Sequence, residues 1–207
     1  MPAECSVTTI DLLRHGHCSW PPGFYGISDN PLSECGWEQM ETTLSAVAPG
    51  YDLALTSPLS RCSGFAEHWA AVHGVECQQT ELLVEGSLGV WEGRSVTDVE
   101  NEDPQGLARF WAEPLRYPPK GAETLEALQL RMTRFVASIL ESHRGSNILM
   151  VTHSGLIRAY LMALLGCESS AWRTIMIAHG SLCRIKIYHQ EGKDDWFQVE
   201  RYGVTGY

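Results

Sequence analysis

Short apolar runs alternate along the chain with longer segments in which apolar residues recur every three or four positions. The short runs, at residues 10–13, 53–56 and 148–151, have the length of buried strands. The longer segments predict helices at residues 33–47, 61–73, 123–143 and 156–165, with Pro49-Gly50, Gly74, Gly145 and Gly166 at their ends. Because strands and helices alternate, we predict an α/β fold with a mainly parallel sheet.

Two parts of the chain depart from this alternation. Residues 182–188 and 196–202 alternate between apolar and polar positions, and predict a strand hairpin that turns at Glu191-Gly192-Lys193. Residues 86–121 show only a weak pattern and contain several tryptophans and prolines. We interpret them as a lid-like excursion from the sheet, within a single domain of residues 1–207.

The composition narrows the class of protein. With 44% hydrophobic residues among 207, the chain can bury a core, which argues against disorder. Its formal net charge of −10 repels polyanions, so we expect no nucleic-acid partner, and an anionic substrate would need a local cluster of arginines. The most apolar helical stretch, residues 159–167, is too short to cross a bilayer, so no membrane partner is expected either.

The cysteines and the first residues bear on the cellular compartment. The seven cysteines are widely spaced and form no C-x-x-C pair, which indicates neither a disulfide framework nor a zinc site. Residues 1–9 lack the basic and long apolar segments of a signal peptide. We therefore expect a cytoplasmic protein with reduced thiols, as a monomer or a homodimer.

Two histidines directly follow predicted strands. His15 stands in Arg14-His15-Gly16 after the first strand, and His153 stands in Thr152-His153-Ser154-Gly155 after the third. Arg61 begins the helix that follows the strand at 53–56. Because ligands of open parallel sheets bind at the carboxyl ends of the strands, we expect these side chains to converge there.

This set of residue types suits phosphoryl transfer. The planar fork of an arginine matches phosphate oxygens, and a neutral imidazole can attack phosphorus. Gly16 is expected to let the backbone approach the phosphate closely. A leaving alkoxide needs a proton, and Glu85, in a glycine-interrupted segment, is the candidate general acid. Its rivals are Glu81 and Glu92, of which Glu92 is interpreted as structural.

Taken in order, the motifs resemble those of a known family. They are Arg14-His15-Gly16, then Gly26-x-x-Asp29-x-Pro31-Leu32 with Gly36, then Ser57-Pro58-x-x-Arg61, then Glu85-x-x-x-Gly89-x-Trp91-Glu92-Gly93, and finally His153-x-Gly155. This ordered set, within residues 8–160, is similar to the histidine phosphatase superfamily, in the branch that includes the cofactor-dependent phosphoglycerate mutases. The resemblance implies a phosphoglycerate mutase-like, three-layer α/β/α sandwich.

The resemblance also implies a role for each residue. His15 would be the nucleophile that forms a phosphohistidine, and Arg14, Arg61 and His153 would hold the phosphoryl oxygens. Glu85 would give a proton to the leaving group and then act as the base for water. The resemblance implies no metal and no cofactor.

The first motif departs from the family pattern. Many members carry Glu, then Ser or Thr, then a downstream Asn after the R-H-G triplet, where this chain has His17, Cys18 and Pro21. That Asn usually contacts the phosphate. His17 is a candidate substrate contact, and it is open whether His17 and Cys18 replace the usual phosphate contacts.

Within the family, the chain looks most like α-ribazole phosphatases, which remove a 5′-phosphate late in the assembly of the cobalamin nucleotide loop. The basis is a short first loop with Pro22-Gly23 and Gly26, the run Pro119-x-Gly121-Ala122-Glu123-Thr124, and the compact length. The expected substrate is therefore a small phosphorylated metabolite, with α-ribazole 5′-phosphate foremost.

Other residues and other functions stay open. Trp20 and Trp111 are candidates to contact an aromatic base of the substrate, and His179 is a candidate to line the pocket. One alternative is a broad-specificity phosphatase or a phosphoglycerate mutase-type enzyme of the same fold, although the chain lacks the longer insertions of the mutases. Another is a non-catalytic phosphate-binding module, which would have no use for a positioned acid. Neither a G-x-S-x-G nor a Walker A pattern is present.

Overall fold

A six-stranded sheet forms the centre of the computed structural model, which describes residues 6–47 and 50–206. Pro49, the predicted helix end, and the first part of the 1–9 segment lie outside the described residues. The strand order is β3-β2-β4-β1-β5-β6. The bounds are β1 (Ser6–Arg14), β2 (Leu53–Thr56), β3 (Glu76–Gln79), β4 (Asn147–Thr152), β5 (Leu182–His189) and β6 (Trp196–Val204). The first four strands run parallel and the β5–β6 hairpin is antiparallel, which confirms the predicted sheet.

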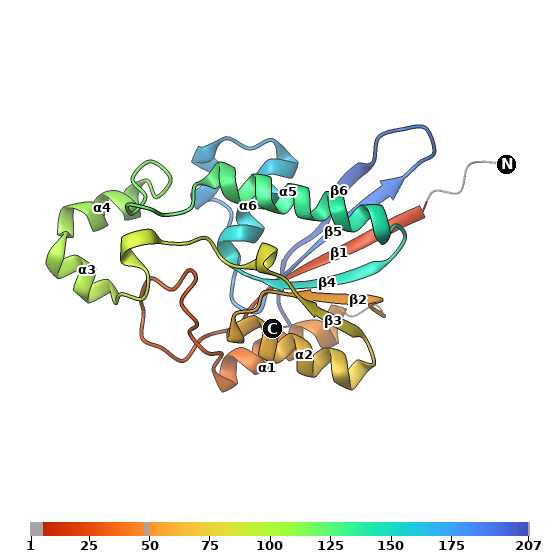
Figure 1. Ribbon diagram of the computed structural model, residues 1–207, viewed down its shortest axis with the longest axis horizontal. Coiled ribbons are helices and arrows are strands. Elements are labelled where there is room, and N and C mark those ends of the chain that lie inside the picture. The colour runs from red at the N-terminus through yellow and green to blue at the C-terminus, as the bar shows by residue number, and fades with distance from the viewer. Residues whose placement is uncertain (1–5, 48–49, 207) are drawn as a thin grey trace.

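Helices cover both faces of the sheet and so make three layers (Figure 1). Helices α5 (Leu125–Ser142) and α6 (Ser154–Leu165) pack on one face, and α1 (Glu34–Val47) and α2 (Ser60–His73) pack on the other. In β1, Ile10 and Leu12 join the core under α5 and α6, whereas Leu13 joins the core under α1 and α2. Because both faces are covered, the central strands are apolar at successive positions, as the sequence pattern indicated.

Side-chain caps explain where the helices begin. The hydroxyl of Ser33 accepts a hydrogen bond from the backbone N–H of Gly36 at 3.0 Å, which makes Ser33 the cap of α1. The hydroxyl of Thr124 accepts from the N–H of Ala127 at 3.2 Å and caps α5. Helices α2 and α6 end at Gly74 and Gly166, as predicted. None of the helices in the described part of the chain has both the length and the apolar character needed to cross a membrane.

The excursion at residues 86–121 has a small apolar core of its own. It contains a 3₁₀ turn and two short helices, α3 (Val96–Glu102) and α4 (Pro104–Ala112), which the weak sequence pattern did not reveal. Trp91, Val99 and Leu107 are buried there around Phe24, which belongs to the loop after β1. The N–H of Phe24 donates to the carbonyl of Arg94 at 2.9 Å. Helices α3 and α4 therefore stand at one end of the molecule, tied to the first loop (Figure 1).

Candidate active site

His15 follows the last residue of β1, and its backbone N–H donates to the carbonyl of Thr152 at the end of β4 at 3.0 Å. Its side chain is only 7% exposed, and its Nδ1 lies 2.8 Å from the carbonyl oxygen of Gly16. Since a carbonyl can only accept, Nδ1 carries the proton and Nε2 keeps a free electron pair. Burial, followed by the charges of Arg14 and Arg61, lowers the pKa of His15 well below 6.5. At neutral pH the imidazole is therefore uncharged and nucleophilic at Nε2.

Arg14 lines the same cavity as His15. Its Nη1 donates to the carbonyl of Ile177 at 2.7 Å, and its Nη2 lies 2.8 Å from Nε2 of His179. Burial is the main reason that the pKa of Arg14 falls to about 10, so the side chain is still charged at neutral pH. Among the described residues, Arg14 Nε is the buried side-chain nitrogen or oxygen that has no hydrogen-bond partner.

A hydrogen bond joins the side chains of Arg61 and His153 near the carboxyl ends of β2 and β4. Arg61 is 2% exposed and donates to the carbonyls of Tyr25, Gly26 and Ser28, which belong to the loop after β1. Its Nε donates to Nδ1 of His153 at 3.3 Å. Four of the five N–H groups of Arg61 are thus used within the protein. The side chain brings a fixed positive charge and one further donor.

His153 is the residue just before α6, where its side chain makes no capping hydrogen bond, and it is fully buried next to His15. The two rings lie 5.2 Å apart between centroids. Because Nδ1 of His153 accepts from Arg61, its Nε2 carries the proton and donates to the hydroxyl of Ser57 at 2.9 Å. Burial, then the neighbouring His15 and Arg61, lowers the pKa of His153 well below 6.5. His153 stands next to the nucleophile as expected, but both of its nitrogens are bonded within the protein and it does not line the cavity.

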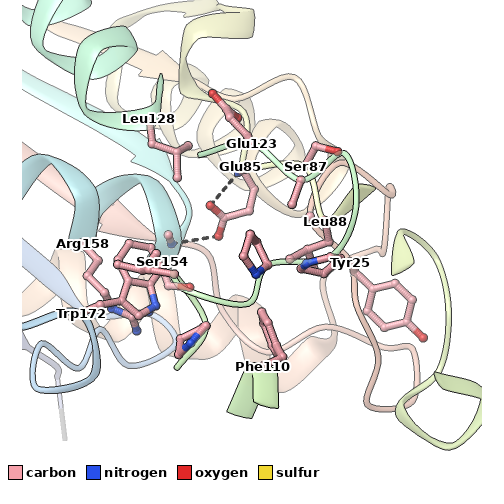
Figure 2. Close-up of a pocket in the computed structure, with 18 of the residues that line it drawn as sticks. Tyr25, Glu85, Ser87, Leu88, Phe110, Glu123, Leu128, Ser154, Arg158 and Trp172 are labelled. Atoms are coloured by element: carbon pink, nitrogen blue, oxygen red, sulfur yellow. Dashed lines mark hydrogen bonds between the residues drawn. The ribbon is translucent and has the colours of Figure 1, made fainter. Parts of the chain in front are cut away.

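The carboxyl group of Glu85 lies at the first turn of α6 (Figure 2). Its oxygens accept from the backbone N–H of Gly155 at 3.0 Å and of Leu156 at 3.2 Å. A Cβ at residue 155 would lie 2.5 Å from Oε1 of Glu85, so the glycine leaves room for the carboxyl group in its observed position. Of the two rivals, Glu92 accepts from the N–H groups of Ser28 and Leu88 and supports the loops. Glu85 is therefore the carboxyl group of the three that lines the cavity.

Gly16 has a packing role that the sequence analysis did not include. A Cβ at residue 16 would lie 1.9 Å from the carbonyl oxygen of Gly36 in α1, and Gly16 is not among the residues that line the cavity. The glycine therefore lets α1 pack against the chain just after the nucleophile. His17 and Cys18 both line the cavity, and Cys18 Sγ lies 3.6 Å from Nδ1 of His15.

The side chains of Arg14, His15, Arg61 and Glu85 form the floor of a cavity of about 1000 Å³. Above the floor, the cavity is lined by aromatic and apolar side chains from the first loop, the excursion and the segment after α6 (Figure 2). They include Trp20, Tyr25, Phe110, Trp111, Leu115 and Trp172. Trp20 and Trp111 thus both lie on the cavity wall, and their side chains are 44% and 54% exposed. The space is much larger than a phosphate group requires.

Two further basic residues line this cavity: Arg158, which the sequence analysis did not single out, and His179, which it named as a candidate. Arg158 of α6 donates from Nε to the carbonyl of Ile175 at 2.8 Å, and its guanidinium lies 4.6 Å from the ring centroid of Trp172. His179 lies against Arg14, and its ring is 5.7 Å from that of His15. Neither residue stands in one of the five motifs. For Arg158, the only sequence signal was its place one turn into the helix that follows His153.

Comparison with known proteins agrees with this geometry. The family model described as histidine phosphatase superfamily (branch 1) matches residues 10–199, and the chain belongs to that superfamily. The solved structure of Bacillus stearothermophilus YhfR is 27% identical, with a TM-score of 0.83, and the match covers 96% of this chain and 98% of that one. The likeness confirms the predicted α/β/α sandwich.

Curated relatives carry different substrate names at similar identity. Phosphoserine phosphatase 1 of Hydrogenobacter thermophilus is 28% identical over 162 residues, which are 77% of this chain and 77% of the relative. The adenosylcobalamin/α-ribazole phosphatase of Escherichia coli is 29% identical over 181 residues, which are 85% of this chain and 88% of the relative. Family membership therefore supports phosphatase activity and leaves the substrate to be argued from the site.

Proposed function

We propose that the protein is a phosphomonoesterase that passes through a phosphohistidine on His15. The observation that carries this proposal is the pairing of two unused groups, Nε2 of His15 and the buried, unpartnered Nε–H of Arg14. A buried polar group without a partner costs stability, so it is expected to serve a ligand. A phosphoryl group satisfies both, because its oxygens accept from the arginine while its phosphorus faces the imidazole.

The first step transfers the phosphoryl group to the enzyme. Nε2 of His15 attacks phosphorus, the N–P bond forms, and the ester P–O bond breaks. Glu85, in its protonated form, gives its proton to the departing alkoxide. Nδ1 of His15 keeps its proton and continues to donate it in a hydrogen bond to the carbonyl of Gly16. This hydrogen bond stabilises the positive charge that the ring acquires. Arg14 and Arg61 compensate the charge of the phosphoryl oxygens.

The second step returns the enzyme to its starting state. The carboxylate of Glu85 takes a proton from water, and the resulting hydroxide attacks phosphorus. The N–P bond breaks, inorganic phosphate leaves, and His15 regains its neutral form. Glu85 alternates between acid and base, so one carboxyl group serves both steps.

The substrate we propose is α-ribazole 5′-phosphate, a nucleotide-like phosphomonoester of cobalamin nucleotide-loop assembly. Three observations support it: the motifs of the first loop, the relative from Escherichia coli, and a cavity wide enough for a base and a ribose. The aromatic wall formed by Trp20, Phe110 and Trp111 suits a flat ring. Residues 86–121 would then serve as the lid that encloses the base.

A panel of phosphomonoesters tests this proposal. We expect kcat/KM for α-ribazole 5′-phosphate to exceed the values for phosphoserine, 3-phosphoglycerate and sugar phosphates, without an added metal and in the presence of a chelator. Similar values across the panel would indicate a broad-specificity phosphatase. Transfer of the phosphoryl group to a second phosphoglycerate, instead of water, would indicate a mutase. Binding of phosphate without any turnover would indicate a non-catalytic module.

A further inference from the structure

The segment at residues 177–181, which leads into β5, forms hydrogen bonds with the end of β1. The N–H of Gly180 donates to the carbonyl of His15 at 3.2 Å, and the N–H of Arg14 donates to the carbonyl of Ser181 at 2.9 Å. The carbonyl of Ile177 accepts from Nη1 of Arg14 at 2.7 Å. This segment therefore fixes the backbone of Arg14 and His15. It also binds one end of the Arg14 guanidinium.

The other end of that guanidinium is held by a side chain. Nη2 of Arg14 lies 2.8 Å from Nε2 of His179. A guanidinium only donates, so Nε2 of His179 accepts, and the ring must be neutral with its proton on Nδ1. Burial, followed by the charges of Arg14 and His17, lowers the pKa of His179 to about 4. The groups that face the ring are Arg14 and His15, from the end of β1, and His17.

We infer that His179 is a positioning residue, which in its neutral form fixes the Arg14 guanidinium in the orientation that receives the phosphoryl group. With one acceptor on Nη1 and another on Nη2, the planar group is held at two points. Its remaining N–H groups, including the unpartnered Nε–H, then have a fixed direction beside His15. An arginine prepared in this way loses little conformational freedom when it binds an anion.

The contacts of His179 favour this role over a direct role in the reaction. Its hydrogen-bonding nitrogen is occupied by Arg14, so it is not free to act as a base toward water. A purely space-filling ring would need no acceptor at that point. The inference rests on the proposed function to the extent that Arg14 is taken to bind the phosphoryl group of the substrate.

Two substitutions of His179 separate these roles. His179→Gln keeps an oxygen acceptor for Arg14 and cannot be protonated, whereas His179→Leu keeps similar bulk and removes the acceptor. We expect the Leu variant to lose roughly ten- to a hundredfold in affinity for inorganic phosphate, measured by titration calorimetry, and in kcat/KM on p-nitrophenyl phosphate. The Gln variant should stay within about threefold of the native protein, because the hydrogen bond to a charged donor is preserved.

A double-mutant cycle with Arg14→Ala distinguishes a positioning role from a merely structural one. It compares the effect of His179→Leu with and without the Arg14 side chain. If His179 acts through Arg14, His179→Leu should have no further effect on kcat/KM in the Arg14→Ala background. Thermal unfolding of each variant checks the fold, and His68→Leu, at an exposed histidine of α2, is the control for loss of an imidazole elsewhere.

Two results would overturn the inference. One is native phosphate affinity and kcat/KM in His179→Leu. The other is an equal loss with and without Arg14. Phosphate binding needs no turnover, so this series decides the role of His179 even if no phosphohistidine forms and the proposed function fails.

Discussion

At the floor of the cavity, His15 and Arg61 are 7% and 2% exposed, whereas at its wall Trp20 and Trp111 are 44% and 54% exposed. The floor residues stand at or near strand ends, and each is bonded to backbone carbonyls: His15 to Gly16, and Arg61 to three carbonyls of the first loop. The wall tryptophans are held by ring contacts, such as that between Trp20 and Tyr25 at 5.3 Å.

This difference separates two tasks of the site. Buried groups that are bonded to the backbone keep one geometry, which chemistry requires. Half-exposed rings on the first loop and on the short helix α4 can adapt to a ligand and can change without loss of the fold. We therefore expect changes in the floor to abolish or slow turnover of every substrate. Changes in the wall should alter which substrate is preferred.

The largest expected effect comes from removing the nucleophile. His15→Ala should lower kcat by roughly 10⁴-fold or more on every phosphomonoester, because no other described side chain offers a free nitrogen at that point. Steady-state assays on p-nitrophenyl phosphate and on a nucleotide would measure it. Thermal unfolding should show that the variant is folded, and His68→Ala serves as the matched control. Substantial activity in folded His15→Ala would refute the mechanism.

The next effect depends on the leaving group. Glu85→Gln should lower kcat/KM by roughly 10²- to 10⁴-fold for alkyl phosphates, whose alkoxide needs a proton. The loss should be much smaller for p-nitrophenyl phosphate, because its phenolate leaves without one. Equal losses on both substrates would assign Glu85 to binding instead of proton transfer.

Gly155→Ala should reproduce this selectivity in weaker form. The new Cβ would meet the carboxyl group of Glu85 at 2.5 Å and displace it, while the backbone is otherwise unaffected. Gly64→Ala in α2, where a Cβ would meet nothing within 4 Å, is the control and should leave the rates unchanged. If Gly155→Ala turned over alkyl phosphates at the native rate, the observed position of Glu85 would not matter for the reaction.

A smaller effect is expected at the wall. Trp111→Ala or Trp20→Ala should lower kcat/KM for α-ribazole 5′-phosphate by roughly tenfold or less, since an aromatic contact contributes about 1 kcal/mol. Activity on p-nitrophenyl phosphate should hardly change, because that substrate does not reach the outer wall. An equal loss of kcat/KM on both substrates would show that the wall tryptophans also maintain the geometry of the floor residues. The two regions would then not have separate tasks.

The smallest expected effect is on stability as the pH falls. His15, His153 and His179 have pKa values lowered below 6.5 in the folded protein, so the unfolded chain binds more protons below that pH. The stability that the neutral rings contribute is present above pH 6.5 and is lost as the pH falls toward their folded-state pKa values. We expect the Tm to fall by a few degrees between pH 7.5 and 5.5. The slope should be shallower in His179→Gln, and a Tm that rises over this range would contradict the assigned protonation states.

The sequence predicted the residues at the strand ends better than the contacts between distant parts of the chain, for a physical reason. His15, Arg61 and His153 each stand a few residues after a strand, and parallel strands bring their ends together, so local position was enough to place them. His179 meets Arg14 across 165 positions of the chain, and no local pattern encodes that hydrogen bond. The reason for Gly16 was likewise out of reach, because it depends on the approach of Gly36 in three dimensions.

The excursion shows a second limit of the sequence pattern. Helix α3 has seven residues and buries Val99, and helix α4 has nine and buries Leu107. So few buried positions per helix do not produce a visible repeat. Their small core is completed by Phe24 from the first loop, far away in the sequence. The segment was therefore recognisable as an excursion from the sheet, but its helices were not.

The phosphorylated enzyme is the most direct test of the central claim. The protein would be mixed with ³²P-labelled substrate, quenched within milliseconds in alkali, digested and mapped by mass spectrometry. A phosphohistidine is stable in alkali and labile in acid, unlike a phosphoserine. The account predicts such a label on Nε2 of His15, formed faster than phosphate is released and absent from His15→Ala. Turnover without any label on His15, or a label on another residue, would contradict it.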